Sequence, residues 1–334
     1  MKGAKKVLIL FSALILVALL ASCGLAADKF VCKVSSANSA SFPPYRAFDE
    51  VIEFLREKSG GRIEMIKYDD GQLGDQIEVL ESIQMGMIQM TMPYTSDLAG
   101  FDQRFQVLDL PFLFTDYPTA RKALEGPLGK KFDELYKEQG FLAFGYNPGG
   151  IRSVTNGKRP VLKLEDLKGL KIRTMQNPMH IAMFKALGAN PTPLSYSELY
   201  TALQQGVVDG QENGPVQIVD ARIEEVQKYY SLTRHLQSIE VLLVSKTWFE
   251  SMPKDLQDIF VEGMKLLEER ETKYTFEYEE ECMEIMRKAG VQINDVAPEE
   301  LERFKEKCQS IYADFEKVIG KELMQMALDA SNSR

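Results

Sequence analysis

The 334-residue sequence lacks the motifs that mark the common enzyme classes. Only two histidines are present, His180 and His235, and neither belongs to a metal-ligand spacing such as His-Glu-x-x-His. There is no Gly-x-Ser-x-Gly nucleophile turn, no Gly-x-x-x-x-Gly-Lys-Ser/Thr phosphate loop and no Gly-x-Gly-x-x-Gly dinucleotide turn. We therefore expect no metal and no cofactor. Catalysis by paired carboxyl groups stays open, because pairing in space cannot be read from a sequence.

Basic residues are also too few for a nucleic-acid partner. Forty Lys and Arg stand against 49 Asp and Glu, which gives a formal net charge of -9. Binding to nucleic acid requires basic stripes that neutralise phosphates, so we exclude this class of partner. The hydrophobic content of 45% is ordinary for a soluble protein with a sizeable core.

Long hydrophobic runs are absent after the start of the chain. Three lysines within the first six residues precede an apolar run, Val7 to Ala21, that is short for a membrane span. This pattern is typical of an export signal, so residues 1–27 are predicted to be a signal peptide and the mature protein to be periplasmic.

Two processing sites follow this run and both stay open. Leu20-Ala21-Ser22-Cys23 resembles a bacterial lipobox, in which Cys23 would become the acylated first residue. Gly24-Leu25-Ala26 offers small residues to ordinary signal peptidase. Against a lipid anchor, the first predicted strand begins near Phe30, which leaves almost no tether.

Three further cysteines, Cys32, Cys282 and Cys308, are an odd number without metal-type pairing. This favours buried or mildly reactive thiols. A Cys282–Cys308 disulfide remains an alternative, because the predicted compartment permits one.

From Phe30 the chain alternates between strand and helix patterns, which predicts an α/β fold with a mostly parallel sheet. The first unit comprises a strand at Phe30–Ser35, a helix from Pro43 to Gly60, a strand at Ile63–Tyr68, a helix at Asp75–Met85 and a short strand at Ile88–Met92. A second α/β unit between about Gly150 and Leu236 follows strand candidates at Phe141–Tyr146 and Ile151–Val154. It contains strands at Leu170–Met175 and Val207–Gln211 and helices that begin at Asn177 and Ser195.

The last third of the chain is rich in helix. A strand at Ile239–Ser245 precedes a charged helix from Pro253 to about Ala289, which is unusually long. Such a helix is either a solvated surface element or a strut that crosses two lobes. A strand at Val291–Asn294 and helices from Pro298 to Asp329 complete the chain. No linker or repeat appears, so the lobes are expected to be joined by strands that cross a hinge more than once.

One arginine has the position of a ligand-binding residue. Arg173 ends an apolar strand directly before a predicted helix start, which is where α/β sheets bind ligands. Its planar guanidinium matches both oxygens of a carboxylate, and the helix N-terminus adds amide donors. The alternative is a solvated arginine in a surface ion pair.

Four strings carry a family resemblance. They are DLKGLKIR (166–173), ALGANPTPL (186–194), SELYT (197–201) and ALQQGVVDGQEN (202–213). Together they resemble the solute-binding subunit of tripartite ATP-independent periplasmic (TRAP) transporters, the DctP-type family. Weaker similarity extends over nearly the whole mature chain, through GQLG (71–74) and LDLPFLF (108–114).

The resemblance implies a two-lobed fold of the periplasmic-binding-protein type (type II), with a ligand cleft between the lobes and a long helix that spans both. We expect lobe I to comprise residues 28–149 plus about 239–278. Lobe II is then expected to comprise residues 150–238 plus about 279–334.

The resemblance also implies which residues bind the ligand. Arg173 matches the family arginine that pairs with the ligand carboxylate, and Arg152 matches a second, assisting arginine. Asn213 resembles the amide that orients the same carboxylate, although Gly214 interrupts the commoner Asn-Pro junction. Positions that resemble other ligand contacts are Tyr196 and Gln176, and in lobe I Tyr94, Gln76 and either Ala37 or Asn38. Tyr94 and Gln76 replace acidic residues of sialic-acid-binding members, which disfavours sialic acid.

The resemblance finally implies a non-enzymatic binding subunit that captures a small organic carboxylate by hinge closure and delivers it to the TRAP membrane subunits. The preferred ligand is a uronate or other sugar acid. A C4-dicarboxylate is the alternative, but it needs a second cation for which lobe I shows no candidate. An extracytoplasmic sensor subunit and a secreted enzyme on acidic sugars also stay open.

Overall fold

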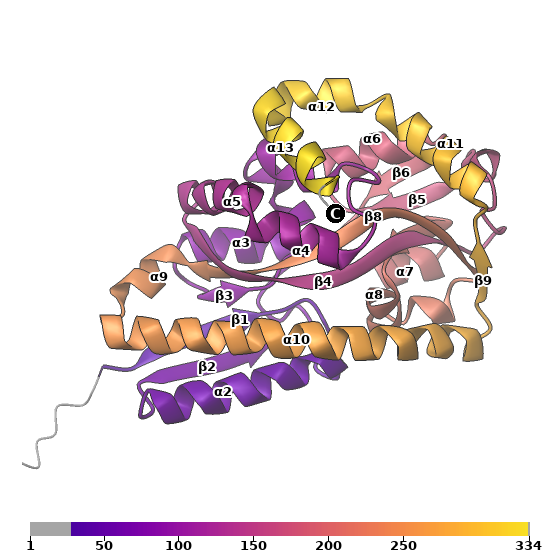
Figure 1. Ribbon diagram of the computed structural model, residues 1–334. Coiled ribbons are helices and arrows are strands. Elements are labelled where there is room, and N and C mark those ends of the chain that lie inside the picture. The colour runs from indigo at the N-terminus through magenta and orange to yellow at the C-terminus, as the bar shows by residue number, and fades with distance from the viewer. Residues whose placement is uncertain (1–27, 333–334) are drawn as a thin grey trace, which may run out of the picture.

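The computed structural model describes residues 28–332. They form an α/β fold in which helices pack against one mixed β-sheet (Figure 1). Within these residues nine strands lie in the order β2-β1-β3-β8-β4-β7-β5-β6, and β9 pairs with the first residues of β8. The strands are β1 (Phe30–Ser35), β2 (Ile63–Tyr68), β3 (Met90–Thr91), β4 (Phe141–Asn156), β5 (Lys171–Thr174), β6 (Asn190–Pro193), β7 (Gly210–Asn213), β8 (Tyr229–Ser245) and β9 (Gln292–Asp295). The predicted signal peptide and Cys23 lie outside the described residues.

The pairing divides the sheet into two parallel groups around an antiparallel pair. β1 pairs in parallel with β2 and β3, and β5 pairs in parallel with β6 and β7. Between these groups β4 and β8 pair antiparallel to one another. Because β4 and β8 run through both groups, the two lobes share one continuous sheet.

β4 and β8 are longer than the sequence pattern predicts. The strands expected at 141–146 and 151–154 are parts of the single strand β4, and the strand expected at 239–245 is only the second part of β8. Register shifts interrupt the β4/β8 ladder, one of them directly after Pro148. Proline has no N–H to donate to a neighbouring strand, so within a sheet it is tolerated at irregularities of this kind.

The helices cover the sheet and join the two strand groups (Figure 1). They are α2 (Arg46–Lys58), α3 (Gln76–Gln84), α4 (Tyr117–Glu125), α5 (Pro127–Glu138), α6 (Pro178–Ala186), α7 (Leu199–Gln204), α8 (Pro215–Asp220), α9 (Lys246–Ser251), α10 (Lys254–Lys288), α11 (Pro298–Gln309), α12 (Tyr312–Ile319) and α13 (Lys321–Ser331). Short 3-10 segments are η1 (Pro43–Tyr45), η2 (Thr95–Gly100), η3 (Gln103–Asp109), η4 (Leu164–Leu167) and η5 (Ile223–Glu225).

The predicted long helix is confirmed as α10, which has 35 residues and is therefore roughly 50 Å long. Figure 1 shows it in orange, running from α2 beneath β1 to β9 on the far side. Phe260, in its first half, packs into the core of α2 and β1, whereas Met286, near its end, packs into the core of α7 and α8. α10 therefore contacts both lobes and is not a solvated surface helix.

The cysteines of the described residues are buried free thiols. Cys32 and Cys282 belong to the hydrophobic core between α2, α10 and β1, whereas Cys308 belongs to the core around α6 and α11. The Cys282–Cys308 disulfide that the sequence left open is therefore not formed.

Candidate ligand-binding cavity

A cavity lies where the carboxyl ends of several strands meet. Its empty volume, with the open mouth included, is about 940 Å³. The wall is formed by residues that follow or end β1, β3, β5, β6 and β7, together with the start of α3 and single residues of β4 and β8. The carboxyl ends of parallel strands are the usual ligand site of α/β sheets. All the residues that the sequence assigned to the ligand line this cavity: Arg173, Arg152, Asn213, Gln176, Tyr196, Tyr94, Gln76, Asn38 and Ala37.

Arg173 is buried at the end of β5 and has no carboxylate partner among the described residues. Its Nε donates to the carbonyl oxygen of Leu194 at 2.9 Å, while both terminal nitrogens are without a hydrogen-bond partner in residues 28–332. Burial and the nearby charge of Arg152 lower the pKa of Arg173 to about 10. The open alternative of a surface ion pair is therefore wrong.

Arg152, on β4, is held by a carboxylate of the protein. Its Nε and Nη2 donate to the two carboxylate oxygens of Glu212 at 2.6 and 2.7 Å, and Nη2 also donates to the Glu212 carbonyl. Its Nη1 has no partner in the described part of the chain. The charge of Arg152 is thus largely neutralised by Glu212. Arg152 lines the cavity, where Nη1 remains able to donate a hydrogen bond.

Glu212 is the centre of a buried polar cluster behind the cavity. Besides Arg152 it contacts His235 at 3.0 Å and His180 at 3.5 Å, and Thr233 Oγ1 lies 2.9 Å from the other ring nitrogen of His235. Although burial opposes ionisation, Arg152 keeps the pKa of Glu212 well below its usual range. The sequence pattern alone indicates no role for Glu212, although this residue stands directly before Asn213.

Asn213 ends β7, and its position depends on the glycine that follows it. The Asn213 side chain donates to Gln211 Oε1 at 2.8 Å, and one amide hydrogen remains for the cavity. A Cβ on Gly214 would lie 2.8 Å from the carbonyl oxygen of Gly149 in β4. Gly214 therefore allows the close approach to β4 that places Asn213 in the wall.

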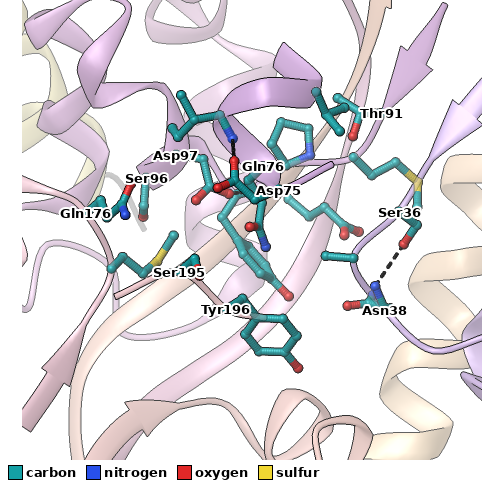
Figure 2. Close-up of a pocket in the computed structure, with 18 of the residues that line it drawn as sticks. Ser36, Asn38, Asp75, Gln76, Thr91, Ser96, Asp97, Gln176, Ser195 and Tyr196 are labelled. Atoms are coloured by element: carbon teal, nitrogen blue, oxygen red, sulfur yellow. Dashed lines mark hydrogen bonds between the residues drawn. The ribbon is translucent and has the colours of Figure 1, made fainter. Parts of the chain in front are cut away.

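The remaining predicted residues surround the cavity on its other sides (Figure 2). Gln76 begins α3, whose N-terminus is capped by Asp75 through hydrogen bonds from Ile77 N and Glu78 N. Asn38 is buried after β1, and its N–H donates to Ser36 Oγ at 3.1 Å. Figure 2 shows Tyr196 across the cavity from Gln76 and Asp75. Contact of these side chains with a ligand stays a prediction.

Besides Asp75, which caps α3, the wall contains two carboxyl groups to which the sequence pattern assigned no ligand contact. Asp97 follows β3 within η2, and Glu240 lies in β8. A signal for Glu240 exists, because it is the single acidic residue in the otherwise apolar predicted strand Ile239–Ser245. Asp97 has no comparable signal, since its segment follows neither helix nor strand periodicity.

Within residues 28–332 no group of three or more His, Cys, Asp and Glu side chains is arranged to hold a metal ion. None of the helices in this range combines the length and apolar character that a membrane crossing requires.

The comparison with known protein families matches most of the chain. The family model described as "Bacterial extracellular solute-binding protein, family 7" (DctP) matches residues 34–318. A solute-binding protein of Verminephrobacter eiseniae is 34% identical over 284 residues, which cover 85% of this chain and 84% of the relative.

Solved structures agree with the sequence comparison. The sugar acid binding protein of Advenella mimigardefordensis in complex with galactonate has a TM-score of 0.88 and 30% identity, covering 91% of this chain and 98% of that chain. A TRAP periplasmic solute-binding protein of Sulfurospirillum deleyianum with bound succinate has a TM-score of 0.85 and 30% identity, covering 90% and 98%. The fold and the family match over residues 34–318 therefore agree. The chain belongs to the DctP family of bacterial extracellular solute-binding proteins, the binding subunits of TRAP transporters.

Proposed function

We propose that this protein captures a small organic monocarboxylate, preferably a uronate or other sugar acid, and delivers it to the membrane subunits of a TRAP transporter. In this proposal the ligand carboxylate pairs with Arg173, Arg152 and Asn213 assist, and polar groups of lobe I close over the hydroxyl groups. The protein then binds its ligand in a fixed ratio and does not turn it over.

The observation that carries this proposal is the state of Arg173. A buried guanidinium without a carboxylate partner is costly, because burial removes water from a full positive charge. Its two unpartnered terminal nitrogens match the two oxygens of a carboxylate in one plane. A carboxylate that enters the cavity would therefore complete a pair that the protein leaves open.

Hinge closure is the second part of the proposal. The proposed lobe boundaries at 149/150, 238/239 and 278/279 fall within β4, β8 and α10, so these three elements would bend or act as pivots when the lobes move. The ligand would stabilise the closed form by contacting both lobes at once.

The ligand class is supported by one relative and questioned by another. The Advenella protein holds galactonate, a sugar acid, whereas the Sulfurospirillum protein holds succinate, a C4-dicarboxylate. A dicarboxylate remains the second candidate for this reason. The cavity offers it no second unpaired cation among its lining residues, which favours the monocarboxylate.

The test is a thermal-shift screen against organic acids, followed by calorimetry on the Arg173→Ala variant. Ligand binding raises the melting temperature by mass action, so the screen identifies the acid. Removing one partner of a buried ion pair should weaken binding of that acid about a hundredfold or more. Lys171→Ala is the matched control, because it removes the same charge from the same strand at an exposed position. Equal affinities of Arg173→Ala and the wild type would refute the proposal.

A further inference from the structure

We propose that Asp97 and Glu240 form an acidic wall that accepts the hydroxylated end of a monocarboxylate and excludes a second ligand carboxylate. The proposal rests on the proposed function, because it assumes that Arg173 fixes the first carboxylate. It adds two residues that determine specificity within the same cavity.

The charges of the cavity lining are unequally distributed. The lining contains two cations, Arg152 and Arg173, and three acids, Asp75, Asp97 and Glu240. Arg152 is bound to Glu212, and the carboxylate of Asp75 caps α3. The groups left to meet a ligand are therefore one cation and two carboxyl groups.

Asp97 offers part of its carboxyl group to the cavity. One oxygen, Oδ2, accepts from the backbone N–H of Tyr94 at 3.0 Å, and Oδ1 has no hydrogen-bond partner in the described residues. Its side chain is only partly buried, and the exposed part faces the cavity that it lines. In Figure 2 the carboxyl group points toward the middle of the cavity, on the side opposite Tyr196.

Glu240 is placed beside Asp97 by the backbone. An isolated bridge pairs Tyr94 with Glu240, and Val241 N donates to Pro93 O at 3.0 Å, so β8 lies directly against the segment that carries Asp97. On its other side Glu240 faces the carboxyl group of Glu271 of α10, which accepts from Asn147 Nδ2 at 2.6 Å. No Lys or Arg of residues 28–332 forms an ion pair with Asp97 or Glu240.

These surroundings keep both carboxyl groups partly protonated near neutral pH. Burial raises the pKa of Asp97 to about 7 and that of Glu240 to about 8. The charged or titratable groups that face this pair are Tyr45 of η1, Tyr94 itself, Arg152 of β4, Arg173 of β5, Asp109 of η3 and Glu271 of α10. The two arginines lower the pKa of Asp97 without overcoming its burial.

A hydroxyl group and a carboxylate meet this wall with different consequences. A hydroxyl can donate to an ionised carboxyl group or accept from a protonated one, so it is bound in either state. A second carboxylate is repelled by an ionised wall and accepted only where both groups are protonated, so its binding requires the uptake of protons that a hydroxyl does not need. A like-charge contact a few ångströms away in such a site weakens binding by at least about tenfold.

The experiment compares acids that differ at one end only. Calorimetry near neutral pH would measure galactonate against galactarate and gluconate against glucarate, in which a second carboxylate replaces the terminal hydroxymethyl group. We expect the wild type to bind the monocarboxylate of at least one pair at least about tenfold more tightly than its dicarboxylate. Asp97→Asn and Glu240→Gln should each reduce this ratio several-fold. Glu198→Gln, at the mouth of the cavity, removes the same charge and should keep the wild-type ratio.

The outcomes separate this inference from the function on which it rests. Equal affinity of the wild type for both members of each pair, or a ratio that neither variant changes, overturns the acidic wall and leaves carboxylate binding at Arg173 intact. Tight binding by Arg173→Ala overturns the proposed function instead. If the wild type binds no acid of either pair but binds another dicarboxylate, the acidic wall is wrong, and binding of no acid at all refutes both. Thermal melting of each variant shows whether it is folded. If a variant does not fold, the ratio of the wild-type affinities for monocarboxylate and dicarboxylate still tests the acidic wall.

Discussion

Glu212→Gln tests how much stability the protein gains from the carboxylate behind the cavity. The variant keeps the shape of the side chain but leaves Arg152, which is 1% exposed, without a carboxylate. Breaking a buried ion pair from one side costs about 3–5 kcal/mol. The entropy of unfolding is about 2.1 cal/mol/K per residue, so each kcal/mol lowers the melting temperature of a chain of this length by about 1.5 °C, and we expect a loss of about 4–8 °C. Differential scanning calorimetry of the ligand-free protein measures this shift.

The same variant should separate stability from ligand binding. Freed from Glu212, Arg152 would add its charge to that of Arg173, so affinity for an anionic ligand should be retained or increased. Since the pKa of Glu212 is lowered, its contribution is present above the usual carboxyl pKa and is lost as the pH falls through the lowered value. The difference in melting temperature should therefore persist from weakly acidic to weakly basic pH. Glu165→Gln, which breaks an exposed pair with Arg303, is the control and should lower the melting temperature far less, because solvent screens the pair. Equal melting temperatures of Glu212→Gln and Glu165→Gln would refute the reasoning.

Two shorter predictions concern closure and pH. Ser39 of the proposed lobe I donates from its N–H and its Oγ to Asp220 of the proposed lobe II, at 3.2 and 2.6 Å, so this contact would help to hold the lobes closed at the cavity mouth. Asp220→Asn should therefore weaken ligand binding about tenfold in calorimetry. An unchanged affinity would show that the contact does not stabilise the closed form. Burial raises the pKa of Glu240 and Glu271, so the folded protein keeps protons that the unfolded chain has lost. Stability should fall as the pH rises from about 4.5 to about 8, and Glu271→Gln should flatten this decline in thermal melting; a wild-type slope in the variant would exclude the carboxyl pair as its cause.

The parts of the fold that the sequence predicts are those with an apolar face and a clear end. β1 and β2 lie at the predicted residues, because each is a short apolar run bounded by turn residues. The edge strand β6 was missed, since Pro191 and Pro193 argue against a strand except at an edge. The first part of β8 was missed for another reason. Its buried side chains include Thr233 and His235, which serve the polar cluster around Glu212 and therefore break the apolar alternation.

The candidate site was predictable where a motif identified it and not where only tertiary contacts define it. Arg173 could be proposed from its position at a strand end, and the family resemblance added Arg152 and Asn213. What the sequence could not show is that these two arginines differ, because the partner of Arg152 lies 60 residues away on β7. Asp97 and Glu240 come together only through the contact of β8 with the segment after β3.

Under the proposed function, the contrast between the two arginines would explain how the cavity selects an anion. Arg152 is neutralised by Glu212, so it stabilises the fold and can assist ligand binding mainly by the hydrogen bond that its Nη1 donates. Burial and the charge of Arg152 lower the pKa of Arg173 from 12.5 to about 10, which corresponds to roughly 3 kcal/mol of unfavourable free energy held in the empty protein. In the proposed function a ligand carboxylate would relieve that cost, whereas a neutral sugar of the same shape could not. The folded protein thus keeps one buried guanidinium without a carboxylate partner, and the proposed affinity for a carboxylate would follow from this unpaired charge.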